Sequence, residues 1–137
     1  MKSKQPSDEA LVSIDVVCSD APLCDLEDLF DIELASSSYS KGDVRGKRIM
    51  DYSMARFELG SCNVNDLNQT VSNYLAAIID RGIINNFKSE LIDSVSLNVG
   101  IFSMGPTTTV SLCPIVIGYL DKLGMNVIIS YYSDLWE

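Results

Sequence analysis

The sequence predicts an α+β protein in which helices cover one face of a mainly antiparallel sheet. Two patterns support this class. Between Val64 and Ile79, apolar residues recur at helical spacing, which is typical of a helix with one buried face. The segments on either side alternate apolar and polar residues, as strands do when one face lies against a core. With 137 residues, of which 47% are hydrophobic, the chain is large enough to bury such a core.

The first part of the chain is expected to hold one strand and one helix. Residues 1–10 are expected to form a disordered polar tail, and residues 11–137 a single domain. Alternating apolar residues predict a strand over Val12–Cys18. Pro22 suits the first turn of a following helix. The core-facing residues of that helix would be Leu23, Leu26, Leu29 and Phe30.

Two strands are expected next. A short edge strand over Ser36–Ser40 leads into an exposed basic turn, Lys41–Arg48, which would keep that edge from pairing with another chain. The alternation over Met54–Leu59 predicts a strand with one wet face. Its inward residues would be Ala55, Phe57 and Leu59, and its outward residues Met54, Arg56 and Glu58.

The longest helix is expected to start at Val64, with Asn63 as its N-cap. Gly82 interrupts it, and a second short helical stripe then continues to Asp93. Because its apolar face cannot stay in water, this helix needs a sheet to lie on.

The rest of the chain predicts two strands, a helix and a last strand. Val95–Ile101 alternates as a strand, and Met104–Pro106 supplies a turn into a hairpin partner over Thr108–Leu112. A third helix is expected from Pro114 to Gly124, because proline favours helix starts and glycine favours helix ends. Val127–Tyr132 is the last predicted strand.

The order of the first six elements is strand, helix, strand, strand, helix, strand. This order matches the split βαβ, or ferredoxin-like, arrangement, in which helices stack on one face of a mainly antiparallel sheet. The last three elements, strand, helix and strand, would form a C-terminal extension of this core.

The net charge of −9 lies in one part of the chain. Between Asp8 and Glu33 there are nine acids and no base, whereas the remaining ten acids and ten bases cancel. Nucleic acid is therefore an unsuitable partner, because phosphate recognition needs a basic surface. A basic protein suits the charge better. The residues expected to face it are Asp20, Asp25, Glu27, Asp28, Asp31 and Glu33.

Several kinds of catalytic site are excluded by composition. The chain has no histidine, so Ser–His and Cys–His pairs and histidine metal sites are ruled out. The acids on the face of the predicted first helix indicate a solvated face rather than a catalytic pair or a cation site. Gly42–Arg48 lacks the spacing of a phosphate-binding loop. We therefore expect no enzyme activity, no catalytic residue, no cofactor and no metal.

The cysteines and the C-terminal aromatic residues are expected to serve the core. The four cysteines include no Cys-x-x-Cys pair, which zinc sites usually show, and so predict small buried side chains. They are Cys18, Cys24, Cys62 and Cys113. Tyr131, Tyr132 and Trp136 are expected to cover the end of the core, with an interface as the alternative.

Three segments carry a resemblance to known proteins. They are Ser38–Asp43, the strand Ala55–Leu59 with the helix after it, and Leu120–Gly124 leading into Val127–Tyr132. Through these segments the chain resembles a small uncharacterised bacterial domain family over about residues 11–132. As a small acidic single domain, the chain is also similar in type to the immunity proteins of contact-dependent growth inhibition and related toxin systems. This resemblance implies a protein that neutralises a toxin by binding it, although no residue motif carries over.

The expected function is therefore that of a cytoplasmic immunity protein, which binds a cognate toxin, most suitably a basic nuclease, through its acidic surface. An alternative is a small ligand-binding domain or enzyme that uses the open face of the sheet. A further alternative is a structural subunit whose strand edge pairs with a copy of itself. The chain is expected to be a monomer or a weak homodimer and to contact neither nucleic acid nor membrane.

Overall fold

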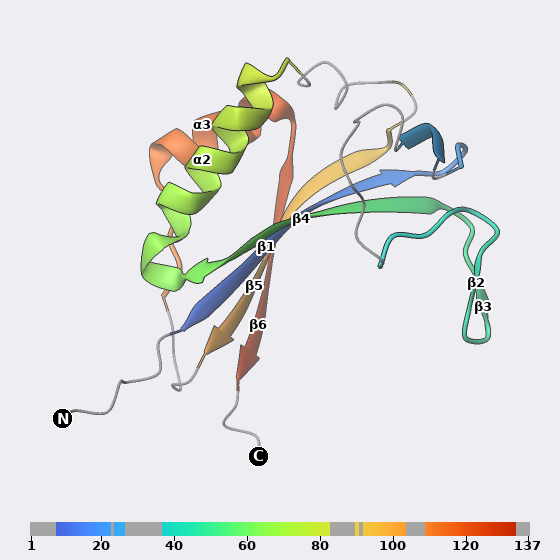
Figure 1. Ribbon diagram of the computed structural model, residues 1–137, viewed down its shortest axis with the longest axis horizontal. Helices are drawn as coiled ribbons and strands as arrows, with labels where there is room; N and C mark the ends of the chain where they lie inside the picture. The colour runs from blue at the N-terminus through green and yellow to red at the C-terminus, as the bar shows by residue number, and fades with distance from the viewer. Residues whose placement is uncertain are drawn as a thin grey trace.

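A computed structural model of the chain describes residues 8–22, 24–26, 37–82, 90, 92–103 and 109–133, and it shows an α+β fold (Figure 1). Its main sheet has four strands in the order β4–β1–β5–β6. The strands are β1 (Glu9–Cys18), β4 (Ser53–Asn63), β5 (Ser94–Ser103) and β6 (Asn126–Ser133). β1 runs antiparallel to both β4 and β5, whereas β5 and β6 are parallel, so the sheet is mixed.

The helices lie together on one face of this sheet (Figure 1). A single 3-10 turn, η1 (Val64–Asp66), leads into α2 (Leu67–Asp80), and α3 (Pro114–Leu123) packs beside α2. None of the helices in the described part of the chain is long and apolar enough to span a membrane.

The predicted split βαβ core is present. β4 and β5 are joined through α2 but are separated in the sheet by β1, which is the defining feature of that arrangement. The predicted C-terminal extension is present in part: its helix α3 and its last strand β6 are found, and β6 adds a strand beside β5. The edge strand predicted over Ser36–Ser40 is reduced, in its described residues, to one bridge, in which Tyr39 pairs with Met54 on the outer side of β4.

The core lies between the sheet and the two helices. Alternate residues of the central strands β1 and β5 supply the sheet side and are almost wholly buried, as their alternation predicted. From β1 these are Ala10, Val12, Ile14 and Val16, and from β5 they are Val95, Leu97, Val99 and Ile101. The helix side comes from Leu67, Val71, Leu75 and Ile78 of α2 and from Val116, Leu120 and Leu123 of α3.

The ends of both helices confirm their predicted signals. The Asn63 side chain accepts a hydrogen bond from the backbone N–H of Asn65 at 2.9 Å. α2 ends at Asp80, just before Gly82, which has a φ of 75°. α3 starts at Pro114 and ends before Gly124, whose φ of 68° is easily adopted without a side chain. The stripe predicted between Gly82 and Asp93 falls mainly on residues 83–89 and 91, outside the described residues.

The predicted hairpin partner over Thr108–Leu112 is wrong. Residues 109–113 form no strand, and Thr108 lies outside the described residues. Because β5 has β1 on one side and β6 on the other, it has no free edge for a hairpin partner. Asn68 of α2 holds the segment instead: its amide donates to the Ser111 carbonyl at 2.8 Å and accepts from the Cys113 N–H at 2.9 Å.

Three boundaries and orientations also differ from the prediction. β1 begins at Glu9, so the last two residues of the expected tail belong to the sheet, and residues 1–7 lie outside the described residues. Met54 was expected to face outward but is only 8% exposed, because the chain around Tyr39 pairs along its outer side. β4 continues past Leu59 to Asn63, through an irregularity in its pairing with β1 between Val12 and Ser13.

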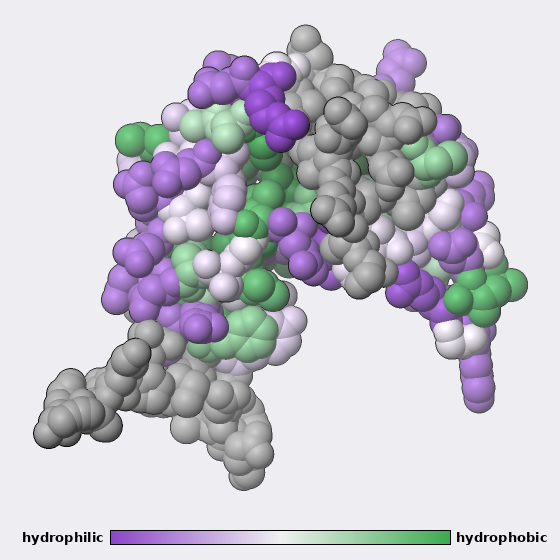
Figure 2. Space-filling view, in the orientation of Figure 1, coloured by the Kyte–Doolittle hydropathy of each residue, from purple (hydrophilic) through white to green (hydrophobic). Residues whose placement is uncertain are grey.

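The predicted basic turn is exposed, as expected, and forms a small hairpin. Its strands are β2 (Val44–Arg45) and β3 (Arg48–Ile49), which make up a separate two-stranded sheet. This hairpin projects from the body of the protein at the lower right of Figure 1. Val44 and Ile49 are both strongly exposed there, so the hairpin carries apolar as well as basic side chains (Figure 2).

Candidate functional site

Two of the six predicted partner-facing acids lie within the described residues. Asp20 follows the end of β1, and Asp25 lies in a helical turn over residues 24–26; both are exposed. Glu27, Asp28, Asp31 and Glu33 lie outside the described residues.

The turn that carries Asp20 and Asp25 is fixed by its buried neighbours. The Ala21 N–H donates to the sulfur of Cys18 at 3.2 Å, and the Asp25 N–H donates to the Pro22 carbonyl at 3.1 Å. Ala21 and Leu26 are buried in the core. Because these side chains point inward, the two carboxylates remain at the surface.

Two further acids gather at this end of the sheet. β1 ends where the antiparallel strands β4 and β5 begin, so Asp51, just before β4, and Asp93, just before β5, lie near Asp20. The Ser19 hydroxyl donates to the Asp93 carboxylate, and the Asp93 N–H donates to the Val17 carbonyl at 2.8 Å. We call the four exposed residues Asp20, Asp25, Asp51 and Asp93 the acidic end.

A hollow of about 420 Å³ lies at the acidic end and is lined by Val17, Ser19, Asp51 and Tyr52. Asp51 and Ser19 both line this hollow, and the Ser19 hydroxyl donates a hydrogen bond to Asp93. Sequence reasoning missed Asp51 and Asp93, because each stands alone in the chain and only the strand pairing brings them to Asp20. Among the described residues, no group of histidine, cysteine or acidic side chains is arranged to hold a metal ion.

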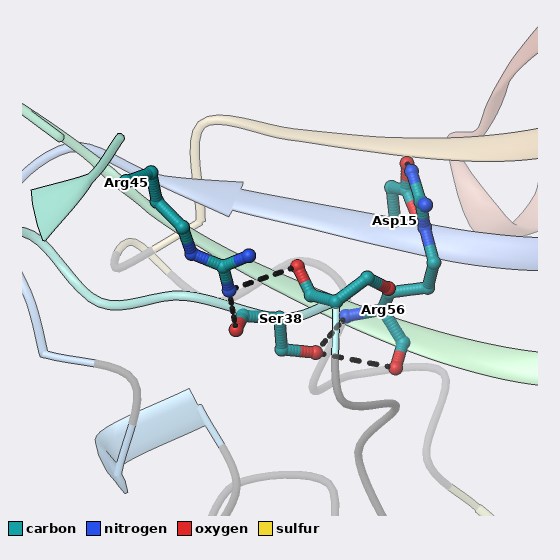
Figure 3. Close-up of polar contacts among 5 residues, drawn as sticks. Asp15, Ser38, Arg45 and Arg56 are labelled. Carbon is teal, nitrogen blue, oxygen red and sulfur yellow. Dashed lines mark hydrogen bonds and ion pairs between the residues drawn. The ribbon is translucent and has the colours of Figure 1, made fainter. Parts of the chain in front are cut away.

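One acid of the acid-rich segment is neutralised within the fold. Asp15 of β1 lies opposite Arg56 of β4, and its two carboxylate oxygens accept from Nε and Nη2 of Arg56 at 2.7 and 2.8 Å (Figure 3). These hydrogen bonds to Asp15 raise the pKa of Arg56, although burial opposes the shift. Asp15 therefore belongs to the sheet and is not available to a partner, whereas the acidic end forms no ion pair with a described base.

The outer side of β4 is covered near its start by the chain before the hairpin. Tyr39 and Met54 exchange two backbone hydrogen bonds, of 3.0 and 2.9 Å. The Ser38 hydroxyl continues this pairing, since it accepts from the Arg56 N–H at 2.9 Å and donates to the Arg56 carbonyl at 3.5 Å (Figure 3). Arg45 of the hairpin donates to the Ser38 carbonyl at 2.7 Å and lies over the Tyr39 ring, 5.4 Å from its centre.

Tyr39 should ionise at a higher pH than a free tyrosine side chain. Burial, followed by a side-chain hydrogen bond with Tyr52, raises the pKa of Tyr39 to about 12. Since the folded state favours the neutral phenol, its contribution to stability is complete below about pH 10 and is lost as the pH rises towards 12. Tyrosinate absorbance should show a late step in wild type that Tyr39→Phe removes; an unchanged titration curve would contradict this assignment.

The open face of the sheet carries a shallow hollow of about 180 Å³. The Phe102 and Tyr132 rings stack beside it with centres 5.0 Å apart, and the side-chain nitrogen of Asn98 is buried there without a hydrogen-bond partner among the described residues. The other residues that line it are Leu11, Ser13, Arg56, Val99, Gly100 and Ser130.

A second hollow, of about 150 Å³, lies between α2 and β4, where Figure 2 shows hydrophobic side chains. It is lined mainly by apolar side chains, with Glu58 and Arg81 among the lining residues. The apolar lining residues include Phe57, Leu59, Ala77 and Ile78.

The cysteines and terminal aromatic residues only partly follow their predictions. Cys18 is buried, Cys62 and Cys113 are half-buried, and all four cysteines are free thiols, but Cys24 is exposed. Tyr131 and Tyr132 are exposed rather than packed over the core, because they lie on the edge strand β6; Trp136 lies outside the described residues.

Comparison of this chain with protein-family models, curated proteins and solved structures found no match. A function can therefore be inferred only from the surfaces described above.

Proposed function

We propose that this chain is a non-catalytic immunity protein, which binds and neutralises a basic toxin domain, most suitably a nuclease, through its acidic end. The observation that supports this proposal best is the grouping of Asp20, Asp25, Asp51 and Asp93 around one end of the sheet. All four carboxylates are exposed, and none is paired with a described base.

Such a surface is suited to a partner that itself binds phosphates. A nuclease presents lysine and arginine side chains to its nucleic acid, and these would meet the carboxylates of the acidic end instead. Long-range attraction between the two surfaces would speed their association, and salt would slow it by screening. An immunity protein of this kind acts in the cytoplasm of the cell that it protects.

The test is a charge reversal with a matched control. The partner is first isolated by co-purification with the tagged chain from its native host. Asp20→Lys with Asp25→Lys is then expected to weaken binding at least about tenfold, mainly through slower association. Glu9→Lys with Asp66→Lys, two exposed positions at the opposite end of the sheet, where β1 begins and β4 ends, makes the same change in net charge and should have a much smaller effect. Both affinities are measured by calorimetry at low and at high salt.

Equal losses in the two double variants would contradict a localised acidic site and would indicate a net-charge effect only. Unchanged binding in the Asp20 and Asp25 variant would exclude these two residues from the interface. Circular dichroism of both variants establishes that the fold is intact before either result is interpreted.

The open face of the sheet supports a second candidate function, the binding of a small ligand. The hollow beside Phe102 and Tyr132 offers an aromatic surface, with hydroxyl and amide groups next to it. Because Asp15 already neutralises Arg56, an uncharged planar molecule with polar groups would suit the hollow best. Such a ligand would raise the melting temperature of the purified chain without any protein partner, which distinguishes the two functions.

A further inference from the structure

The strand β6 forms one edge of the sheet in the described part of the chain. It pairs with β5 along its whole length, from Asn126 to Ser133, without a shift in register, and no described strand pairs with its other side. Edge strands in natural proteins usually carry charged residues, proline or bulges that discourage pairing. The sequence of β6, NVIISYYS, has no charged residue and no proline. Within the described chain, the outward backbone N–H and C=O groups of β6 are therefore available to another strand.

Large apolar side chains are exposed on both faces of this strand. Ile128 and Tyr132 alternate onto the open face of the sheet, and Ile129 and Tyr131 onto the helix face. Their exposed fractions are 48% for Ile128, 53% for Tyr132, 47% for Ile129 and 45% for Tyr131. Removing these apolar side chains from water would lower the free energy of a complex formed at this edge.

We propose that β6 binds β6 of a second copy of this chain in antiparallel pairing, with Ser130 on the two-fold axis. Directly opposed residues of antiparallel strands point to the same face. Centring on Ser130 therefore places Ile128 opposite Tyr132 on one face and Ile129 opposite Tyr131 on the other. The two sheets join into one, with the helices of both copies on the same side.

Two neighbouring registers also place the helix face of one β6 beside the helix face of the other. They are less favourable, because they oppose apolar to polar side chains. Centring the axis on Ile129 places Asn126 opposite Tyr132, and centring it on Tyr131 places Ser130 opposite Tyr132. Only the Ser130 register opposes apolar to apolar residues on both faces. This self-complementary pattern is what a two-fold interface requires, and it indicates a second copy rather than an unrelated protein.

The charge distribution allows the two copies to meet. The chain carries a net charge of −9, so two copies repel each other wherever acids face acids. β6, however, is uncharged, and it lies at the opposite edge of the sheet from β4, the strand that begins beside Asp51. The described residues of β6 would therefore bring no charge into the interface.

The size of the contact predicts a weak dimer. Eight residues extend about 26 Å at roughly 3.3 Å per residue. A contact of this length, including side chains on both faces, buries roughly 400 Å² per copy, which is below the usual size of a stable interface. Reversible association in the range of about 1–100 μM is therefore expected.

Cysteine cross-linking tests the register. Residues that face each other on the axis have Cα atoms about 4.5–5.5 Å apart, a distance that a disulfide can bridge. Ser130→Cys, with the exposed Cys24 replaced by serine, should give a covalent dimer under mild oxidation. Ser61→Cys in the same background is the matched control, since it places an exposed thiol on β4, at the other edge. Equal cross-linking of the two variants, or none with Ser130→Cys, would overturn the proposed register.

Analytical ultracentrifugation tests the association itself. Wild type should shift from monomer to dimer as its concentration rises from about 1 μM to about 1 mM, whereas Ile129→Lys should remain monomeric. Val44→Lys changes an equally apolar exposed position on the hairpin and should dimerise like wild type. A wild-type chain that stays monomeric throughout would overturn the proposal, as would a dimer that Ile129→Lys does not weaken. Neither measurement requires the acidic end to bind anything.

Discussion

Replacing Ser53 by alanine is expected to lower the free energy of unfolding by about 2–4 kcal/mol. The hydroxyl of Ser53 is fully buried at the start of β4. It donates to the Ala21 carbonyl at 2.7 Å and accepts from the Lys41 N–H at 2.8 Å, so it joins three separate parts of the chain. Alanine would leave both backbone groups without this partner, and an unpaired buried group costs about 1–3 kcal/mol. Urea denaturation measures the difference.

A matched control is Ser13→Ala on the open face of the sheet. Ser13 is only half-buried, and its replacement should change the free energy of unfolding by less than about 0.5 kcal/mol. If Ser53→Ala were equally mild, the two hydrogen bonds would have no net effect on stability. Because Ser53 fixes the turn beside Asp20, its loss should also loosen the acidic end, which hydrogen exchange of residues 18–26 would report.

Replacing Gly60 by alanine is expected to destabilise the protein by about 2–3 kcal/mol. Gly60 has a φ of 130°, a conformation that residues with a side chain rarely adopt. An added Cβ would also lie 2.9 Å from the Tyr74 hydroxyl. The position is structurally required, because the pairing of β1 and β4 shifts by one residue here, where Val12 faces Gly60 and Ser13 faces Glu58.

Two further variants separate the causes of this effect. Adding Tyr74→Phe to Gly60→Ala removes the hydroxyl and should recover only part of the lost stability, since the backbone strain remains. Gly118→Ala lies in α3, where nothing would contact the new Cβ, and it should stabilise the helix by about 0.5–1 kcal/mol. A Gly60→Ala variant as stable as wild type would contradict the assigned backbone strain.

The elements that were predicted correctly depend on local patterns. β1 and β5 were found because every second residue is apolar, and α3 because Pro114 and Gly124 mark its ends. The hairpin partner of β5 was predicted wrongly because the alternation in Thr108–Leu112 is a local pattern too. Whether a segment can pair depends on which strand edges are already occupied, and β6, which follows later in the chain, takes the edge of β5.

The candidate site was only partly predictable for a related reason. The exposure of Asp20 and Asp25 follows from the local sequence, in which their neighbours are apolar. The pairing of Asp15 with Arg56, 41 residues away, depends on the register between β1 and β4. The approach of Asp51 and Asp93 to Asp20 depends on which strands flank β1. A single sequence contains no direct signal for strand register or for the order of strands in the sheet.

The two edge strands of the sheet, β4 and β6, differ in how readily they can pair with another strand. The outer side of β4 is partly occupied by Tyr39 and by the Ser38 hydroxyl, and the strand is distorted at Gly60. In a pair joined through β6, both outermost strands would be β4. A third molecule would therefore meet a strand that is partly occupied near its start and distorted at Gly60. The association would stop at two molecules, and this protein would be protected from growing into fibrils.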